Sequence, residues 1–134
     1  MRGATAISEA ELRAALRAPT EEEVAAALAR FVGAVRASYG ARVQGVFLFG
    51  SRARGDHRAD SDADVAVVLS DGDWEEWRER RRLNRLAESA EAASHVDIQP
   101  WPISWTQWMS ADSAATTPLS RSARREGRRL EAAA

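Results

Sequence analysis

The stretch that decides the fold spans residues 46–69 and reads VFLFGSRARGDHRADSDADVAVVL. It begins and ends with short apolar runs that are rich in β-branched residues, which is the pattern of buried β-strands. Gly50-Ser51 interrupts the first run. After ten intervening residues, Asp62-Ala63-Asp64 leads into the second run. The stretch therefore predicts two neighbouring strands joined by a polar loop.

The two acids at the entry of the second strand are expected on one face. Side chains alternate across a strand, so Asp62 and Asp64 point the same way. Two adjacent carboxylates beside a buried strand repel each other, and this costs stability unless a cation neutralises them. Mg²⁺ is the expected cation, because it takes carboxylate oxygens together with the phosphate oxygens of a substrate. Gly50-Ser51 would let the backbone approach such a phosphate closely.

Length and composition limit the class of protein. The chain has 134 residues, of which 45% are hydrophobic and 29% charged, with a net charge of -1 and no cysteine. This favours one folded domain and excludes a disulfide framework or a thiolate metal site. No apolar run has the length of a membrane span, and the near-zero charge does not indicate a polycation. We therefore expect a cytoplasmic protein that binds neither a membrane nor nucleic acid directly.

The segment around the two acids resembles the signature of the polymerase-β-like nucleotidyltransferases, and in particular their minimal branch. The matching segments are GSRARG at residues 50–55 and SDADV at residues 61–65. In that branch a third carboxylate lies on a later strand, and Asp97 within Val96-Asp97-Ile98 fits this position. The resemblance implies that the catalytic and metal-binding residues are Asp62, Asp64 and Asp97, and that the nucleotide-binding residues are Gly50, Ser51, Arg52 and Arg54.

The resemblance also implies an α+β (α/β) fold, with a small mixed β-sheet of three to four strands and helices packed on one side. We expect a single nucleotidyltransferase domain over residues 1–134, with an N-terminal helical extension over residues 1–19 and the core over residues 20–130. Capping boxes, apolar spacing and proline positions locate the elements. Helices are expected over residues 20–40, 74–93 and 119–126, and strands over residues 43–49, 64–69, 95–99 (ended by Pro100) and near Leu130. Trp101, Trp105 and Trp108 are expected on one side of a turn or short helix.

Several charged residues have simpler structural interpretations. Arg54 could pair with Asp56 or Asp60 to fix the loop, and His57 is interpreted as an ordinary polar loop residue. The arginines within residues 74–93 alternate with glutamates and are interpreted as a solvated face, with a patch for a partner or a triphosphate as the alternative. A polar hairpin-like loop would explain the turn residues alone. It would not explain two acids on one face at a strand entry.

The small size of the chain bears on the acceptor. Once one core is built, little remains to form a deep acceptor pocket. The minimal branch commonly acts as the antitoxin of a small helical toxin of the HEPN type and transfers AMP from ATP to a toxin tyrosine. The resemblance therefore implies a Mg²⁺-dependent protein adenylyltransferase with ATP as substrate and a cognate HEPN-type toxin as partner. Two alternatives stay open: an antitoxin that acts by contact alone, and a small-molecule nucleotidyltransferase of the antibiotic type.

Overall fold

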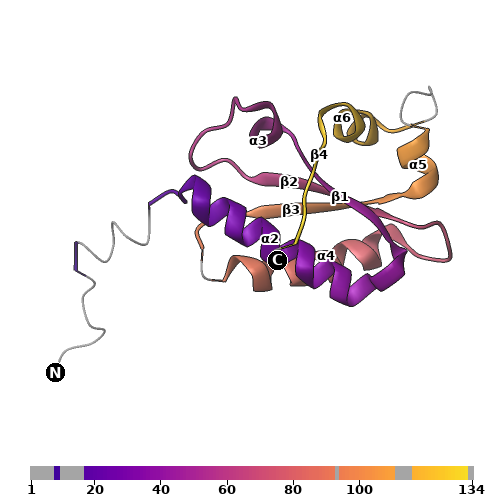
Figure 1. The fold of residues 1–134 in the computed structure, drawn as a ribbon, viewed down its shortest axis with the longest axis horizontal. Helices are drawn as coiled ribbons and strands as arrows, with labels where there is room; N and C mark the ends of the chain where they lie inside the picture. The colour runs from indigo at the N-terminus through magenta and orange to yellow at the C-terminus, as the bar shows by residue number, and fades with distance from the viewer. Residues whose placement is uncertain (1–7, 10–16, 93, 111–115, 133–134) are drawn as a thin grey trace.

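The computed structural model describes residues 8–9, 17–92, 94–110 and 116–132 (Figure 1). The helix expected within residues 1–19 lies almost entirely outside them. No helix of this described part is both long and apolar enough to cross a membrane. The helices are α2 (Glu21–Tyr39), the short 3-10 turn η1 (Gly40–Arg42), α3 (Ser51–Arg54), α4 (Glu76–Glu91), α5 (Trp105–Met109) and α6 (Pro118–Glu126).

A four-stranded mixed sheet forms the centre of the molecule, with the strand order β3-β2-β1-β4. β1 and β2 are antiparallel, as expected from a connection too short for a crossover. β2 and β3 are parallel, because α4 provides the long crossover between them. This confirms the predicted mixed sheet. The strands are β1 (Val43–Phe49), β2 (Ala63–Leu69), β3 (Ile98–Ser104) and β4 (Arg128–Arg129).

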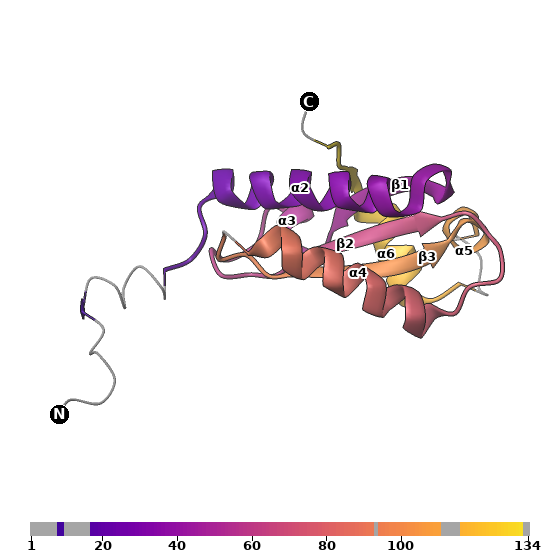
Figure 2. The same ribbon diagram turned by 90° about the horizontal axis from the view of Figure 1, so that it is seen from below.

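Helices cover both faces of the sheet (Figure 1), and Figure 2 looks onto the face that α2 and α4 cover. The long helices α2 and α4 bury the main core against one face, where Val65 and Val67 point. The shorter α5 and α6 lie over the other face, where Trp108 packs near Ala66 and Val68. The expectation that helices pack on one side therefore holds for the long helices and is corrected for the short ones. The physical reason is that β2 is apolar on both faces, so each face must be covered.

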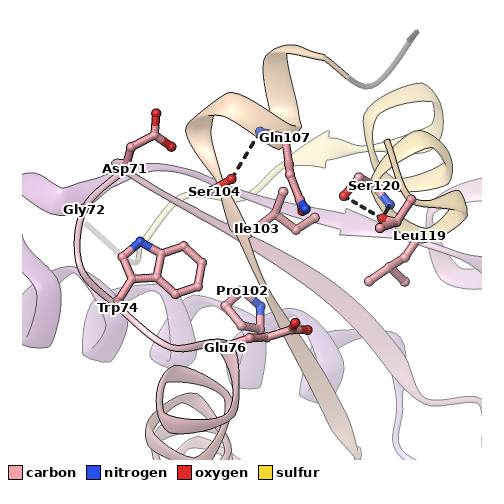
Figure 3. A pocket seen from close by; sticks show the side chains of 11 residues that line it. Asp71, Gly72, Trp74, Glu76, Pro102, Ile103, Ser104, Gln107, Leu119 and Ser120 are labelled. Atoms are coloured by element: carbon pink, nitrogen blue, oxygen red, sulfur yellow. Dashed lines mark hydrogen bonds between the residues drawn. The ribbon is translucent and has the colours of Figure 1, made fainter. Parts of the chain in front are cut away.

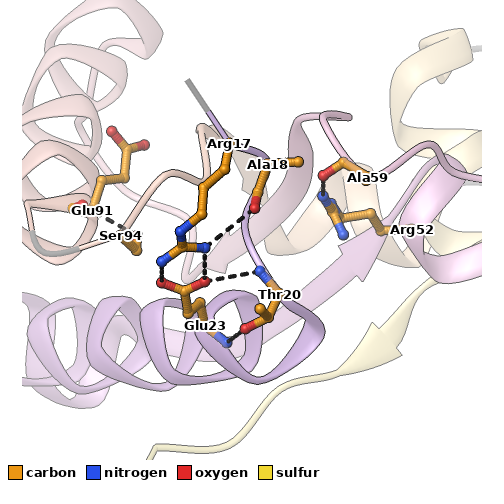
Figure 4. A network of polar contacts seen from close by, with 8 residues as sticks. All are labelled: Arg17, Ala18, Thr20, Glu23, Arg52, Ala59, Glu91 and Ser94. Atoms are coloured by element: carbon orange, nitrogen blue, oxygen red, sulfur yellow. Dashed lines mark hydrogen bonds and ion pairs between the residues drawn. The ribbon is translucent and has the colours of Figure 1, made fainter. Parts of the chain in front are cut away.

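The first turn of α2 confirms the capping signal in the sequence. The Thr20 hydroxyl accepts from the Glu23 N–H at 3.1 Å, and the Glu23 carboxylate accepts from the Thr20 N–H at 2.9 Å. Arg17 donates to the same carboxylate at 2.7 Å (Figure 4). These bonds, that from Arg17 above all, hold the pKa of Glu23 at about 2. The start of α2 is thus fixed by local contacts.

The third strand differs from the expectation. It was predicted over residues 95–99 with Pro100 as its end, but β3 runs through Pro100 and Pro102 to Ser104. β3 is an edge strand, so a proline that lacks an N–H on its open side removes no bond to β2. Trp101, expected in a turn or helix, consequently lies within β3, and only Trp105 and Trp108 lie on α5.

Arg52 holds the polar loop between β1 and β2 through hydrogen bonds to its backbone. Its guanidinium is buried, and it donates to the carbonyl oxygens of Ser61 at 2.9 Å and Ala59 at 3.1 Å, the latter shown in Figure 4. Glu21 of α2 lies 3.6 Å from Arg52 Nη1 and 2.9 Å from His57 Nε2. The loop is therefore tied to itself and to the first turn of α2.

Replacing Arg52 by alanine should destabilise the fold strongly. The change leaves two loop carbonyls without their charged donor, so the free energy of unfolding in urea should fall by about 2–4 kcal/mol. Arg52→Lys should recover only part of this, because an ammonium cannot make the forked contact of a guanidinium. The matched control is Arg58→Ala in the same loop. Its side chain is 88% exposed, and its loss should cost less than about 0.5 kcal/mol. A small effect at both positions would contradict the role given to Arg52.

Candidate functional site

Gly50 and Asp64 lie close together where β1 ends and β2 begins. Phe49, the last residue of β1, lies opposite Asp64 in the antiparallel pair. Gly50 follows with a φ of 76°, a conformation that residues with a Cβ atom rarely adopt. A Cβ atom at position 50 would lie 2.6 Å from Asp64 Oδ2. Glycine is therefore required here both by the backbone angle and by the close approach to Asp64.

The environment of Asp64 disfavours its ionised form. Asp64 is half-buried on the face of β2 that α5 and α6 cover. Burial raises the pKa of its carboxyl, and the charges of Asp62 and Glu126 raise it further. The indole N–H of Trp101 and the charge of Arg54 act in the opposite direction, although the indole does not reach full hydrogen-bond geometry. A cation bound at Asp64 would relieve this repulsion.

Asp62 and Asp97 precede two neighbouring strands. The Ala63 N–H donates to the Asp97 carbonyl oxygen at 2.8 Å, so the two acids lie side by side at the entries of β2 and β3, and both are exposed. Glu91 of α4 is a further acid at this end. Burial raises its pKa, with contributions from the charges of Asp97 and Asp62. The sequence placed Asp97 inside a strand, whereas it lies one residue before β3.

The carboxylates form an open set rather than a closed metal cage. Asp62 and Asp64 supply hard oxygen donors that repel each other, which suits a divalent cation such as Mg²⁺. Within residues 8–9, 17–92, 94–110 and 116–132, no three His, Cys, Asp or Glu side chains are close enough to hold a metal by themselves. The pair therefore fits an ion that completes its coordination with water and phosphate oxygens. The metal-binding role of Asp97 stays a prediction.

The residues predicted to bind the nucleotide take different positions. Ser51 begins α3 and is half-buried, and Arg54 ends α3 with a partly exposed side chain. Arg54 pairs with Asp56 through Nε at 3.1 Å and with Glu126 through Nη1 at 3.0 Å. Arg52 lies on the buried side of α3 and is bonded to loop carbonyls. These bonds give Arg52 a structural role in the loop, and its predicted contact with the nucleotide stays a prediction.

Glu126 is the residue of this site that the sequence argument missed. It ends α6, and its Oε2 accepts from the Gly50 N–H at 3.0 Å as well as from Arg54. Trp101 was also missed, since its segment was assigned to a turn or helix. No local pattern marks Glu126, because the contact depends on how α6 packs against β1. The structure shows why the chain can pack so closely here: a Cβ atom on the neighbouring Gly127 would lie 2.5 Å from the Ala123 carbonyl oxygen.

A separate pocket lies at the opposite end of β2 and β3 (Figure 3). Trp74, Ile103 and Gln107 line it, together with the acids Asp71 and Glu76. Neither arginine nor histidine occurs among the described residues that line this pocket. Its chemistry does not suit a phosphate. This pocket therefore offers no alternative to the predicted nucleotide site beside Gly50 and Asp64, which stays a prediction.

Comparison with solved structures bears on the fold. The crystal structure of a provisionally named nucleotidyltransferase from Sulfolobus solfataricus has a TM-score of 0.53 and 19% identity, over 81% of this chain and 82% of that chain. A toxin–antitoxin crystal structure with AMP-PNP has a TM-score of 0.52 and 22% identity, over 78% of this chain and 73% of that chain. At these identities the likeness shows the fold alone.

Comparison with sequences identifies the family. A protein of Methanocaldococcus jannaschii that carries the provisional name of a protein adenylyltransferase is 43% identical over 42 residues. These residues are 31% of this chain and 42% of that relative, so the match spans less than half of the relative's length. Residues 28–115 match the nucleotidyltransferase domain, and they include β1, the polar loop, β2, α4 and β3. This match covers most of the chain and agrees with the fold, and the protein therefore belongs to the nucleotidyltransferase domain family.

Proposed function

We propose that this protein is an adenylyltransferase that moves AMP from ATP to a hydroxyl group of another protein. The observation that carries the proposal is the placement of Asp64 directly beside the Gly50 turn, with Asp62 two residues before it at the entry of β2. The provisional name of the Methanocaldococcus jannaschii relative supports the reaction type. The AMP-PNP complex of a protein with the same fold supports an adenine nucleotide as substrate.

The proposed reaction is an attack of the acceptor oxygen on the α-phosphorus of ATP. A bond forms between that oxygen and the α-phosphorus, the bond from the α-phosphorus to the oxygen bridging to the β-phosphorus breaks, and pyrophosphate leaves. The proton of the acceptor hydroxyl passes to a base, and we propose Asp97 for this role. The Ser51 hydroxyl and Arg54 would contact the β- and γ-phosphates. Most of the rate gain would come from positioning and charge neutralisation.

Asp62 and Asp64 would hold Mg²⁺ in this reaction, with Asp97 as a further ligand. When bound, the ion would lower the pKa of the attacking hydroxyl and neutralise charge on the leaving pyrophosphate. The mutual repulsion of Asp62 and Asp64 in the protein supports this assignment, since a cation would remove it.

We further propose that the acceptor is a tyrosine of a cognate HEPN-type toxin and that the protein acts as its antitoxin. The resemblance to the minimal branch implies this partner, and a toxin–antitoxin protein with the same fold supports it. A partner could contact the exposed Trp105 and Met109 of α5. Two further tryptophans of this region are less available to a partner: Trp108 is buried, and the Arg80 guanidinium lies 3.6 Å from the centre of the Trp101 ring.

Neutralising Asp64 should separate stability from activity. Burial raises the pKa of Asp64, so its charge destabilises the folded state above that pKa, and Asp64→Asn should keep or raise the melting temperature of metal-free protein at pH 7. This gain should shrink as the pH falls and Asp64 binds its proton. Transfer should fall by about 100-fold or more.

Mg²⁺ with ATP should stabilise the wild type and the control Asp60→Asn in a thermal-shift titration, but Asp64→Asn much less. Equal stabilisation of all three would rule out the metal assignment.

Asp97→Asn should separate nucleotide binding from chemistry. If Asp62 and Asp64 hold the ion that accompanies the nucleotide, the affinity for Mg²⁺–ATP, measured by calorimetry, should change only modestly. The single-turnover rate of label transfer should fall by about 100-fold or more, because a base acts mainly in the transition state. A variant that keeps most of the wild-type rate would show that Asp97 has no role in the chemistry and only precedes β3.

The acceptor can be identified by intact-mass spectrometry on the protein co-expressed with the product of the adjacent gene. With ATP and Mg²⁺, the partner should gain mass in AMP-sized steps on a tyrosine, and co-expression with Asp62→Ala should leave it unmodified. An unmodified partner that is still neutralised would favour an antitoxin that acts by contact alone. Label that appears instead on a small hydroxylated compound would favour a small-molecule transferase.

A further inference from the structure

The Glu126 carboxylate accepts hydrogen bonds from two donors at the start of the polar loop, one on Gly50 and one on Arg54. Its Oε2 accepts from the Gly50 N–H and from Arg54 Nη1, both at 3.0 Å. The Glu126 side chain is 20% exposed, so the contact is formed at the boundary with solvent. Both donors belong to residues proposed to bind the phosphates of ATP. One internal anion therefore occupies donors that the substrate would use.

The fold delivers Glu126 to this position through close packing of the chain after α6. A Cβ atom on Gly127 would lie 2.5 Å from the Ala123 carbonyl oxygen and 3.3 Å from the Phe47 Cβ, so only glycine lets α6 end against β1. The Leu130 N–H then donates to the Val46 carbonyl oxygen at 2.8 Å, which holds the following strand on β1. These contacts fix the backbone next to Glu126, and its partly exposed side chain borders the solvent.

Glu126 lies close enough to Asp64 for the two carboxylates to interact. The charge of Glu126 raises the pKa of Asp64, so the two acids repel each other. An N–H group and a guanidinium offset this, because charge-assisted hydrogen bonds are about twice as strong as neutral ones. A phosphate oxygen is suited to the same donors, since guanidinium groups bind carboxylates and phosphates with similar geometry.

We propose that Glu126 is an internal competitor of the nucleotide: its carboxylate occupies Gly50 N–H and Arg54 in the free protein and is exchanged for a phosphate oxygen when ATP binds. This inference rests on the proposed function, because it uses the same site. Arg54 keeps its pair with Asp56 during the exchange. The nucleotide then binds only the fraction of molecules in which Glu126 has left, which weakens its apparent affinity by that fraction.

Two substitutions separate competition from simple support of the loop. Glu126→Ala removes the competing carboxylate, and Glu126→Asp keeps the charge on a side chain too short to reach both donors. Calorimetry at about 0.15 M salt, where long-range charge effects are screened, would use Mg²⁺–ATP and, as a probe without a nucleoside, inorganic tripolyphosphate. Both variants should bind both probes roughly three- to tenfold more tightly than wild type. Without nucleotide, the melting temperature of Glu126→Ala should be a few degrees lower.

The outcomes distinguish this inference from the proposed function. In Glu126→Ala the affinity for Mg²⁺–ATP should rise while the melting temperature falls. Loss of a contact that only supports the loop would not raise the affinity. If wild type binds Mg²⁺–ATP and Glu126→Ala binds it equally or more weakly, Glu126 only supports the loop and the competition is wrong. If Glu126→Ala does not fold, Glu126→Gln keeps the size and one acceptor oxygen and should still bind more tightly than wild type. If neither wild type nor any variant binds nucleotide, the proposed function fails and the competition fails with it.

Discussion

Gly50 and Asp64 face each other where β1 passes into the polar loop, and no space is left between them for a Cβ atom. This close approach depends on the antiparallel register that sets Phe49 opposite Asp64. It brings a glycine turn next to a carboxylate, and the proposed binding of a phosphate with its cation depends on this arrangement. A shift of the register by one residue would move Asp64 to the other face of the sheet, toward the core under α2 and α4.

The rest of the structure offsets the charge gathered around this contact. Asp62, Asp97 and Glu91 lie at the same end of the sheet as Asp64, and their mutual repulsion opposes folding. Apolar burial on both faces of the sheet supplies the opposing stability. Arg52 donates to two carbonyl oxygens of the loop and so helps to hold it in place.

Local patterns accounted for the centre of this protein. The first strand was predicted over residues 43–49 and forms over those residues, because apolar β-branched runs bounded by turn residues are recognisable without tertiary information. The capping box at Thr20 and the proline at the start of α6 were likewise visible, since both depend on residues a few positions apart. Gly50 and Asp64, which are close together in the structure, also belong to one short stretch of sequence, and the mixed sheet confirmed the fold class.

Only the tertiary structure decided the remaining features, because they depend on which elements become neighbours. Pro100 lies inside a strand, since β3 is an edge strand and its open side needs no donor. Arg52 donates to the carbonyl oxygens of Ser61 and Ala59, a contact that its residue type alone did not indicate, because it depends on how the short α3 sits against the loop. Glu126 reaches Gly50 across 76 positions of sequence, and that contact exists only because α6 packs against β1. A contact at such a separation leaves no periodic or local trace in the sequence, whereas the strands, caps and turns do.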